Sequence, residues 1–178
     1  MSVPVVPHEI GELFERSQAP SALLDALMPG LCRALDCPRC LLFLRDPERR
    51  LSCLTHSWWD KPEHAFSGPT AWFEEPESLA SDDPLFGEAL RNPKAIFVDD
   101  IERAGPQVLN LEYERREFRH RGLIHAPIYH HGRLVGILEP CVFDAPRLWS
   151  AEDRALTAWL QQRLGPIAAA YVAAHAPR

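Results

Sequence analysis

The chain has 178 residues, of which 46% are hydrophobic and 25% charged, a composition typical of one globular domain that buries its own core. The formal net charge is −6, which argues against general nucleic-acid binding, because that activity needs a basic surface. No apolar run approaches the ~18 residues that cross a bilayer, and residues 1–11 lack the basic and apolar regions of a secretory signal. We therefore expect a cytoplasmic protein without a membrane span, in which the five cysteines are reduced.

The N-terminal part predicts an extended arm followed by two helices. Residues 1–7 carry valines and prolines, which favour an arm, and residues 8–17 favour a short helix that ends before a proline. Ser21 is a good N-cap for the next helix, whose leucines recur every three or four residues as one apolar stripe. Pro29 and Gly30 are expected to interrupt that helix.

The next segment predicts a β-hairpin and then a long crossover. Residues 40–44 and 51–56 are short apolar runs joined by a polar turn, which is the pattern of two neighbouring strands. Residues 57–81 form a loop that is long for a compact domain, and such loops are usually functional. Its aromatic side chains either fill the space by packing on one another or stack on a flat ligand or partner. The candidates for a ligand pocket in this loop are Trp58, Trp59, Trp72 and Phe73.

The second half predicts short helices and strands in alternation. Residues 84–90 favour a short helix, residues 95–98 a strand, and residues 112–120 a charged helix. Residues 123–129 and 134–143 favour two strands, joined by a turn in which a glycine supplies positive φ.

The chain ends in a long predicted helix. Ser150 is its N-cap, and Asp153 completes the capping box. Gly165 and Pro166 mark the place at which we expect a kink. Helices at both ends of the chain and a mostly antiparallel sheet between them indicate an α+β fold. The predicted buried stripe of this last helix is Leu156, Trp159, Leu160, Leu164, Ile167, Ala168 and Tyr171.

Three motifs carry a resemblance to a known family. Residues 124–138 (IHAPIYHHGRLVGIL) contain a proline-isoleucine pair, a turn and the spacing G-x-L-x-G-x-L. Residues 145–153 (APRLWSAED) contain P-R-x-W-x-x-E, and residues 98–101 (VDDI) contain an x-D-I element. Together they resemble the GAF domains of phytochromes and cyanobacteriochromes, in which these motifs form a hairpin, open the last helix and follow the third strand.

The resemblance implies a fold and a domain division. The expected fold is a six-stranded antiparallel sheet, with the N- and C-terminal helices on one face and a loop-and-helix crossover on the other. The chain divides into an arm and short helix at residues 1–19, the GAF domain at 20–172 and a tail at 173–178. In this family the terminal helices commonly form a homodimer, and the family implies a cyanobacterial source.

The family's pigment chemistry is expected to be missing. In these relatives a linear tetrapyrrole (a bilin) is attached to a cysteine, and the resemblance places the family's Cys-His pair at Asn110 and Leu111. A second family cysteine, in an Asp-x-Cys-Phe motif, falls at Leu85. Because a thioether needs a thiol, covalent attachment at these positions is predicted to be lost. The alternative is a bilin held without a covalent bond, or through Cys53 or Cys141, in a concave apolar pocket.

Further pocket candidates lie in the second half. His125 faces either the helix layer or the pocket, and the family's pigment-packing histidine falls at Cys141. Arg115 begins a basic run through His120 that either is a solvated helix face or binds an anionic ligand, as basic groups near here hold bilin propionates in relatives. The remaining candidates are Asp83, Tyr113 and Phe118.

The cysteine spacing suggests an iron–sulfur site, but the predicted secondary structure argues against it. Cys32, Cys37 and Cys40 have the spacing of an iron–sulfur loop, which would need Cys53 or Cys141 as fourth ligand. The three are predicted to lie on a helix and a strand and not on one wrapped loop. The C-x-x-C motif leads into a strand, whereas thioredoxin-type sites open a helix. We therefore expect buried cysteines and no metal.

These observations predict a stand-alone, non-catalytic sensory or regulatory GAF domain without a cofactor. It would act through a protein partner or its own dimer. The alternative is a small-ligand sensor that binds a bilin non-covalently or through an unusual cysteine. A thiol-based redox sensor or enzyme is more distant, because GAF proteins that reduce free methionine sulfoxide carry paired cysteines in a region where residues 57–125 have none.

Overall fold

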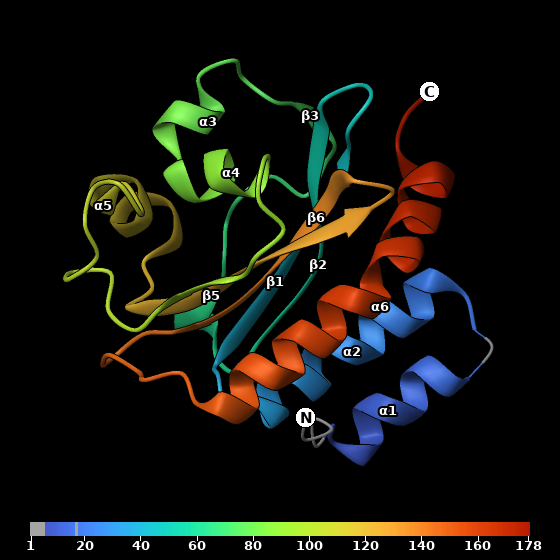
Figure 1. Ribbon diagram of the computed structural model, residues 1–178, viewed down its shortest axis with the longest axis horizontal. Helices are drawn as coiled ribbons and strands as arrows, with labels where there is room; N and C mark the ends of the chain where they lie inside the picture. The colour runs from blue at the N-terminus through green and yellow to red at the C-terminus, as the bar shows by residue number, and fades with distance from the viewer. Residues whose placement is uncertain (1–5, 17) are drawn as a thin grey trace.

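The computed structural model describes residues 6–16 and 18–178, and within them one six-stranded sheet lies between two layers of helices (Figure 1). The strand order is β3-β2-β1-β6-β5-β4, and every neighbouring pair is antiparallel. This confirms the predicted α+β fold. The strands are β1 (Arg39–Asp46), β2 (Leu51–Trp59), β3 (Phe73–Glu74), β4 (Ile96–Val98), β5 (Gly122–His130) and β6 (Arg133–Val142).

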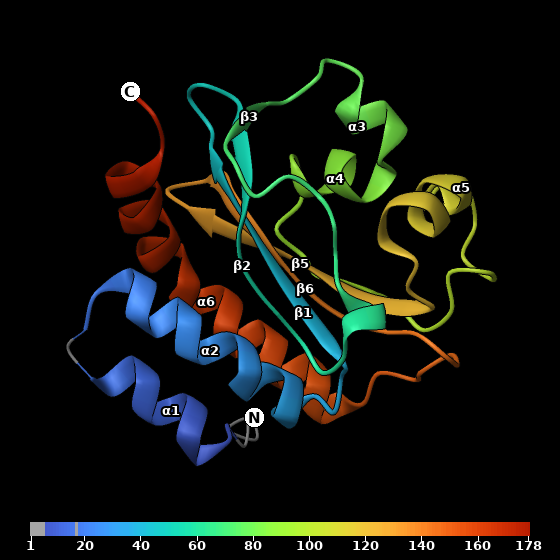
Figure 2. The ribbon, with the colours of Figure 1, turned by 180° about the vertical axis from the view of Figure 1, so that it is seen from behind.

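The helices divide between the two faces of the sheet. The face that carries the terminal helices is covered by α1 (His8–Glu15), α2 (Pro20–Ala34) and α6 (Ala151–His175), and the two views agree on this arrangement (Figures 1 and 2). The connections between β2 and β5 build the other layer. That layer contains η1 (Pro62–His64), α3 (Leu79–Asp82), α4 (Pro84–Ala89), α5 (Leu111–Tyr113) and η2 (Glu114–Phe118).

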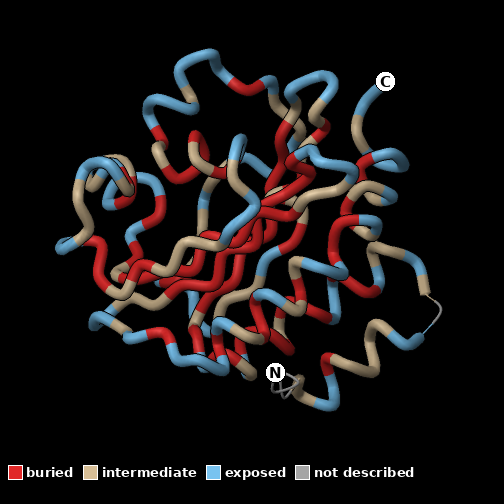
Figure 3. The backbone as a smooth tube through the Cα atoms, viewed as in Figure 1, coloured by how far each residue is buried: buried red, intermediate tan, exposed pale blue. Residues whose placement is uncertain are grey.

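The main core lies between the sheet and the terminal helices. The central strands are buried along most of their length (Figure 3). Because side chains alternate along a strand, every second residue of β1 enters this core and the others face the opposite layer. The main core includes Leu24, Leu27 and Leu31 of α2, Cys40, Leu42 and Leu44 of β1, Ile124 and Ala126 of β5, and Leu156, Leu160 and Leu164 of α6.

Two helix predictions are wrong in detail. The N-cap of α2 is Ala19, with Pro20 at the first helical position, so Ser21 lies inside the helix. The helix also continues through Pro29, which forfeits one backbone hydrogen bond while the leucine stripe packs against the sheet. α6 also continues as one helix through Gly165 and Pro166, and its C-terminal turns run in a different direction from its first turns (Figures 1 and 2). Tertiary packing of the apolar faces outweighs the local breaking tendency of proline.

The central region also departs from the prediction. β2 extends to Trp59, and the crossover adds a two-residue edge strand, β3. The charged helix predicted at residues 112–120 is two short turns, the second of them π-helical, which end where Arg119 adopts a left-handed backbone with φ 60°. The part of the predicted arm at residues 1–5 lies outside the described residues, as does Ser17.

The family-like motif at the start of α6 anchors that helix to the sheet. The predicted capping box is confirmed: Ser150 Oγ accepts the Asp153 N–H at 3.1 Å, and Asp153 Oδ2 accepts the Ser150 N–H at 2.9 Å. The Trp149 indole donates to the Val98 carbonyl at the end of β4, at 3.1 Å. The β5–β6 turn has positive φ at His131 and Gly132, as the hairpin prediction requires. Over residues 6–16 and 18–178, no helix combines the length and apolar character needed to cross a bilayer.

Candidate functional site

A cavity of about 90 Å³ lies between the sheet and the layer built from the crossovers. Its walls come from β1, β2, β3, β5 and β6 on the sheet side and from α3, α4, α5 and η2 on the other side. The lining residues are Phe43, Arg45, Ser52, Phe73, Leu79, Asp83, Phe86, Tyr113, Phe118, His125, Leu134, Gly136, Ile137 and Glu139.

Aromatic side chains fill much of the space beside this cavity. Phe118 is the centre of the group: its ring stacks on Phe66 with centroids 5.1 Å apart and meets Phe43 edge-on at 6.3 Å. Tyr113 packs against the same ring at 6.1 Å. Contacts of this kind add about 0.5–1.5 kcal/mol per pair beyond area burial, so the group stabilises a narrow pocket.

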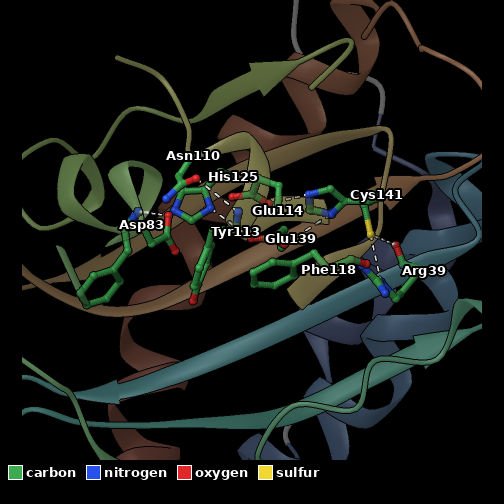
Figure 4. Close-up of polar contacts among 11 residues, drawn as sticks. Arg39, Asp83, Asn110, Tyr113, Glu114, Phe118, His125, Glu139 and Cys141 are labelled. Carbon is green, nitrogen blue, oxygen red and sulfur yellow. Dashed lines mark hydrogen bonds and ion pairs between the residues drawn. The ribbon is translucent and has the colours of Figure 1, made fainter. Parts of the chain in front are cut away.

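Two buried carboxylate–imidazole pairs form a polar network at one end of the cavity (Figure 4). His120 Nε2 lies 2.8 Å from Glu114 Oε2, and His125 Nδ1 lies 3.1 Å from Glu139 Oε2. All four side chains are almost completely buried. Within the described residues, His120 Nδ1, His125 Nε2 and Glu139 Oε1 have no hydrogen-bond partner. Such unpaired buried atoms cost stability and are more frequent at functional sites than elsewhere.

The two pairs differ in where the proton resides. Burial alone would raise the pKa of Glu139, but the hydrogen bond and the positive charge of His125 outweigh burial and hold that pKa below its usual value. Burial also disfavours the charged form of His125, but the hydrogen bond to Glu139 outweighs burial and raises the pKa of this imidazole. This pair is therefore an imidazolium–carboxylate ion pair.

Glu114 is a neutral acid at neutral pH. Burial, followed by repulsion from Glu139 and Asp83, raises the pKa of Glu114 to about 9. Its Oε2 lies 2.8 Å from His120 Nε2. The network therefore holds one ionised and one neutral carboxyl group.

Glu114→Gln is expected to be more stable than the parent at alkaline pH. The folded-state pKa of about 9 lies above the ordinary glutamate value of 4.5, so the proton-linked stability is complete below about 4.5 and is lost as pH rises through about 9. Glutamine keeps the neutral shape and cannot ionise, so we expect a gain on the order of 5 kcal/mol at pH 8 that vanishes near pH 4.5. Urea unfolding across this range measures it.

Glu117→Gln is the matched control, because Glu117 lies in the same π-helical turn but is exposed. Its pH profile should follow that of the parent. A Glu114→Gln profile that also paralleled the parent would show that Glu114 is ionised in the folded protein.

Asp83 supplies a third carboxylate to the cavity wall. It caps α4, with Oδ1 accepting the Phe86 N–H at 3.1 Å, and its side chain is buried. Burial raises the pKa of this group, while His125 and the backbone N–H of Phe86 lower it. The ion pairs formed by the described residues do not include Asp83.

Arg39 links the sheet to the layer above it. Its side chain has no exposed surface, and it donates to the carbonyl oxygens of His64 at 3.2 Å and Phe118 at 2.9 Å. Its Nε lies 3.1 Å from Cys141 Sγ, and the guanidinium lies over the Phe143 ring at 4.7 Å. One side chain thus holds η1, the end of η2 and β6 together.

Five of the sequence-predicted pocket residues line the cavity: Phe73, Asp83, Tyr113, Phe118 and His125. For His125 the sequence left two orientations open, and the structure shows the one that faces the cavity. Figure 4 shows Asp83, Tyr113 and His125 gathered at one end of the site.

The other aromatic candidates lie elsewhere. Trp58 pairs with Cys40, so strand alternation turns it toward the terminal helices, where it and Trp72 pack against the main core. Trp59, opposite Arg39, is half-buried and does not line the cavity. None of these three tryptophans, which the sequence offered as pocket candidates, is among the residues that line the cavity.

The basic run divides between a solvated residue, as one of the two alternatives had it, and a buried one. Arg115 is exposed and ion-paired with Glu102, away from the cavity. His120 was expected on a solvated helix face, but the left-handed turn at Arg119 ends the helix and directs His120 into the interior. Cys141 is buried beside Arg39 and does not line the cavity.

The positions aligned with the family's attachment cysteines have structural contacts of their own. Leu85 is buried in a small apolar cluster with Val98 and Ile101. Asn110 Oδ1 accepts the Tyr113 N–H at 3.3 Å, and its Nδ2 donates to the Asp82 carbonyl at 3.1 Å, which ties α5 to α3. Leu111 is half-buried at the start of α5.

Among the residues of this site that sequence reasoning missed, Arg39, Phe43, Glu114 and Glu139 make the contacts described above. A signal existed for Glu139, since a glutamate inside the otherwise apolar run 134–143 is unusual in a central strand. Arg39 carried a weaker signal, as the first residue of a buried strand. Glu114 had no such signal. It stands among several charged residues, and nothing in the sequence distinguishes the one that the fold buries.

The cysteines do not converge on one site. Cys40 faces the terminal helices with Cys32 and Cys37, whereas Cys141 pairs with Arg39 on the opposite face of the sheet. Contact among the three clustered thiols and their burial raise the pKa values of Cys32 and Cys37, so these thiols stay protonated. In the part of the chain that the structure describes, no three His, Cys, Asp or Glu side chains are placed to hold a metal ion.

Comparison with known proteins gives a family match over most of the chain. The family model described as "GAF domain" matches residues 19–163. No curated protein matches the chain.

Solved structures share the fold at low sequence identity. The GAF domain of an Acinetobacter phosphoenolpyruvate-protein phosphotransferase is 15% identical, with a TM-score of 0.67 over 93% of this chain and 90% of that one. The phycoerythrobilin-bound GAF domain of a cyanobacterial phytochrome is 14% identical, with a TM-score of 0.68 over 94% of each chain. Free methionine-R-sulfoxide reductase from Neisseria meningitidis, in complex with its substrate, is 16% identical, with a TM-score of 0.66 over 93% of this chain and 87% of that one. At these identities the likeness is one of fold.

Proposed function

The chain belongs to the GAF domain family, and on that basis we propose that it is a non-catalytic regulatory domain that has lost covalent bilin attachment and acts through protein contacts. Its partner is another protein or a second copy of the chain, approached through the layer of α1, α2 and α6. We propose a cytoplasmic location for it.

The observation that carries this proposal is the size of the cavity. Sites for drug-sized ligands are roughly 300–1,000 Å³, and a four-ring tetrapyrrole belongs at the upper end of that range. The cavity here is about 90 Å³, and Phe43, Phe66, Phe118 and Tyr113 pack into the surrounding space. A bilin would have to separate these rings before it could enter.

The attachment positions support the same proposal. Neither Leu85 nor Asn110 carries a thiol, and both have local packing or capping roles. The sulfur of Cys53 donates to the Thr70 carbonyl at 3.4 Å, and that of Cys141 lies against Arg39. Neither cysteine lines the cavity, which argues against attachment through them and against thiol catalysis there.

Co-expression with a phycoerythrobilin-producing pathway tests the proposal. We expect the purified protein to show no visible absorption band, because a pocket of about 90 Å³ is too small for the pigment. The phycoerythrobilin-bound phytochrome GAF domain is the positive control. A visible band would overturn the proposal, and denaturation in acid urea would then show whether the pigment is covalently bound.

A bilin held without a covalent bond is the second candidate, and the shared fold with the phycoerythrobilin-bound domain favours it. That function needs the aromatic group around Phe118 to open. A band that appears on co-expression and is lost in acid urea would establish it.

A further inference from the structure

Asp83 is a buried carboxylate that forms no ion pair with the other described residues, although the nearby charge of His125 lowers its pKa. The residue is only 8% exposed, and its side chain accepts a hydrogen bond from the Phe86 N–H. The other buried carboxylates of the cavity region are matched: Glu139 pairs with His125, and Glu75 with Arg45. A buried charge costs several kcal/mol unless an opposite charge or further hydrogen bonds compensate it.

The walls around this carboxylate suit a cation. Five aromatic residues line the cavity together with Asp83, and ring faces attract positive charge through their quadrupoles. The surroundings of Tyr113 are negatively charged. Burial first, and then the charges of Asp83, Glu117 and Glu114, raise the pKa of its phenol. The five aromatic residues are Phe43, Phe73, Phe86, Tyr113 and Phe118.

The volume limits what can enter. A cavity of about 150 Å³ holds a molecule the size of benzene, so about 90 Å³ accommodates roughly four to six non-hydrogen atoms. A nucleotide, a tetrapyrrole or a peptide is too large. An anion would meet the negative charge of Asp83. Arg45 is paired with Glu75, and His125 is paired with Glu139 through Nδ1, which leaves its Nε2 without a partner among the described residues.

We propose that the cavity binds a small organic cation, a protonated amine or methylated ammonium with a short alkyl group, whose positive charge pairs with Asp83 and whose carbons lie among the aromatic rings. Binding supplies the missing counter-charge to Asp83 and replaces water at an apolar wall. This site goes beyond the protein-contact role proposed above and does not depend on it.

Ligand selectivity of the unaltered protein is the first test. Isobutylammonium and tetramethylammonium chloride are compared with isobutanol and sodium isobutyrate, at matched concentration and ionic strength, by thermal unfolding and calorimetry. The two cations should raise Tm and give saturable heat, because a ligand that binds only the folded state stabilises it. The alcohol has nearly the same shape but no charge, and the carboxylate has the wrong charge.

Asp83→Asn is the matched variant. Asparagine caps helices as well as aspartate does, so the cap on α4 is kept while the charge is removed. We expect the variant to bind both cations at least thirtyfold more weakly, the equivalent of about 2 kcal/mol. Asp82→Asn, at the exposed neighbouring position, should bind like the parent.

Two results would overturn the proposal. The first is an equal change in Tm and heat with amine and alcohol in the unaltered protein, which includes no change with either. The second is cation binding by Asp83→Asn that is as tight as in the parent. The pigment experiment is independent of both. A colourless protein that fails to bind these cations would leave the proposed protein-contact function intact and remove only the cation site.

Discussion

Arg39→Ala is expected to lower the free energy of unfolding by about 4 kcal/mol. The side chain has no exposed surface, so its removal leaves a cavity, which costs roughly 24 cal/mol per Å³. The carbonyl oxygens of His64 and Phe118 also lose their donor, at about 1–3 kcal/mol each. Relief from burying the guanidinium charge offsets part of this loss. Denaturant unfolding measures the change.

A second readout tests the linking role of Arg39. Residues 60–66 and the end of η2 should become susceptible to limited proteolysis in Arg39→Ala, because both lose their connection to β1. Arg33→Ala is the control: Arg33 is exposed and paired only with exposed Glu9, so its loss should cost under ~1 kcal/mol. Equal effects of the two substitutions would show that the buried contacts of Arg39 contribute little.

Gly165→Ala is expected to destabilise the protein by about 3 kcal/mol, against the general trend for glycine in helices. A Cβ at this position would overlap the carbonyl oxygen of Tyr129 and lie 3.3 Å from its carbonyl carbon. Backbone atoms of β5 cannot rotate away, so α6 would have to move off the sheet and disturb the packing around Leu164. Thermal and denaturant unfolding both report this change.

Gly11→Ala is the paired control, since Gly11 lies in α1 and a methyl group added there would meet nothing within 4 Å. Here helix propensity should dominate and stabilise the protein by up to about 1 kcal/mol. The same substitution therefore has opposite signs at the two positions. A stabilising Gly165→Ala would show that α6 does not approach β5 as closely as described.

The regular elements were predictable because their signals are local. The strands around residues 40–44, 123–129 and 134–143 are apolar runs bounded by turns, and the Ser150–Asp153 capping box needs only neighbouring residues. Pro29 was misread for the opposite reason. Its helix-breaking tendency is local, but packing of the α2 leucines against the sheet is not, and packing prevailed.

The candidate site was predicted only in part. Asp83, Tyr113, Phe118 and His125 were placed by motif spacing, and they line the cavity. The tryptophans do not line it, because the face that Trp58 takes follows from its pairing with Cys40 in β2, a pairing that exists only in the assembled sheet.

Residue types and their local spacing were enough to establish the family, the antiparallel sheet between terminal helices and the lack of a thiol at Leu85 and Asn110. Which charges are buried became known from the three-dimensional arrangement alone. Glu114, Glu139 and Arg39 come from segments far apart in the chain, and their environment exists only once the layers close over them. Burial and mutual distance set protonation and charge pairing, and neither can be deduced from the order of residues.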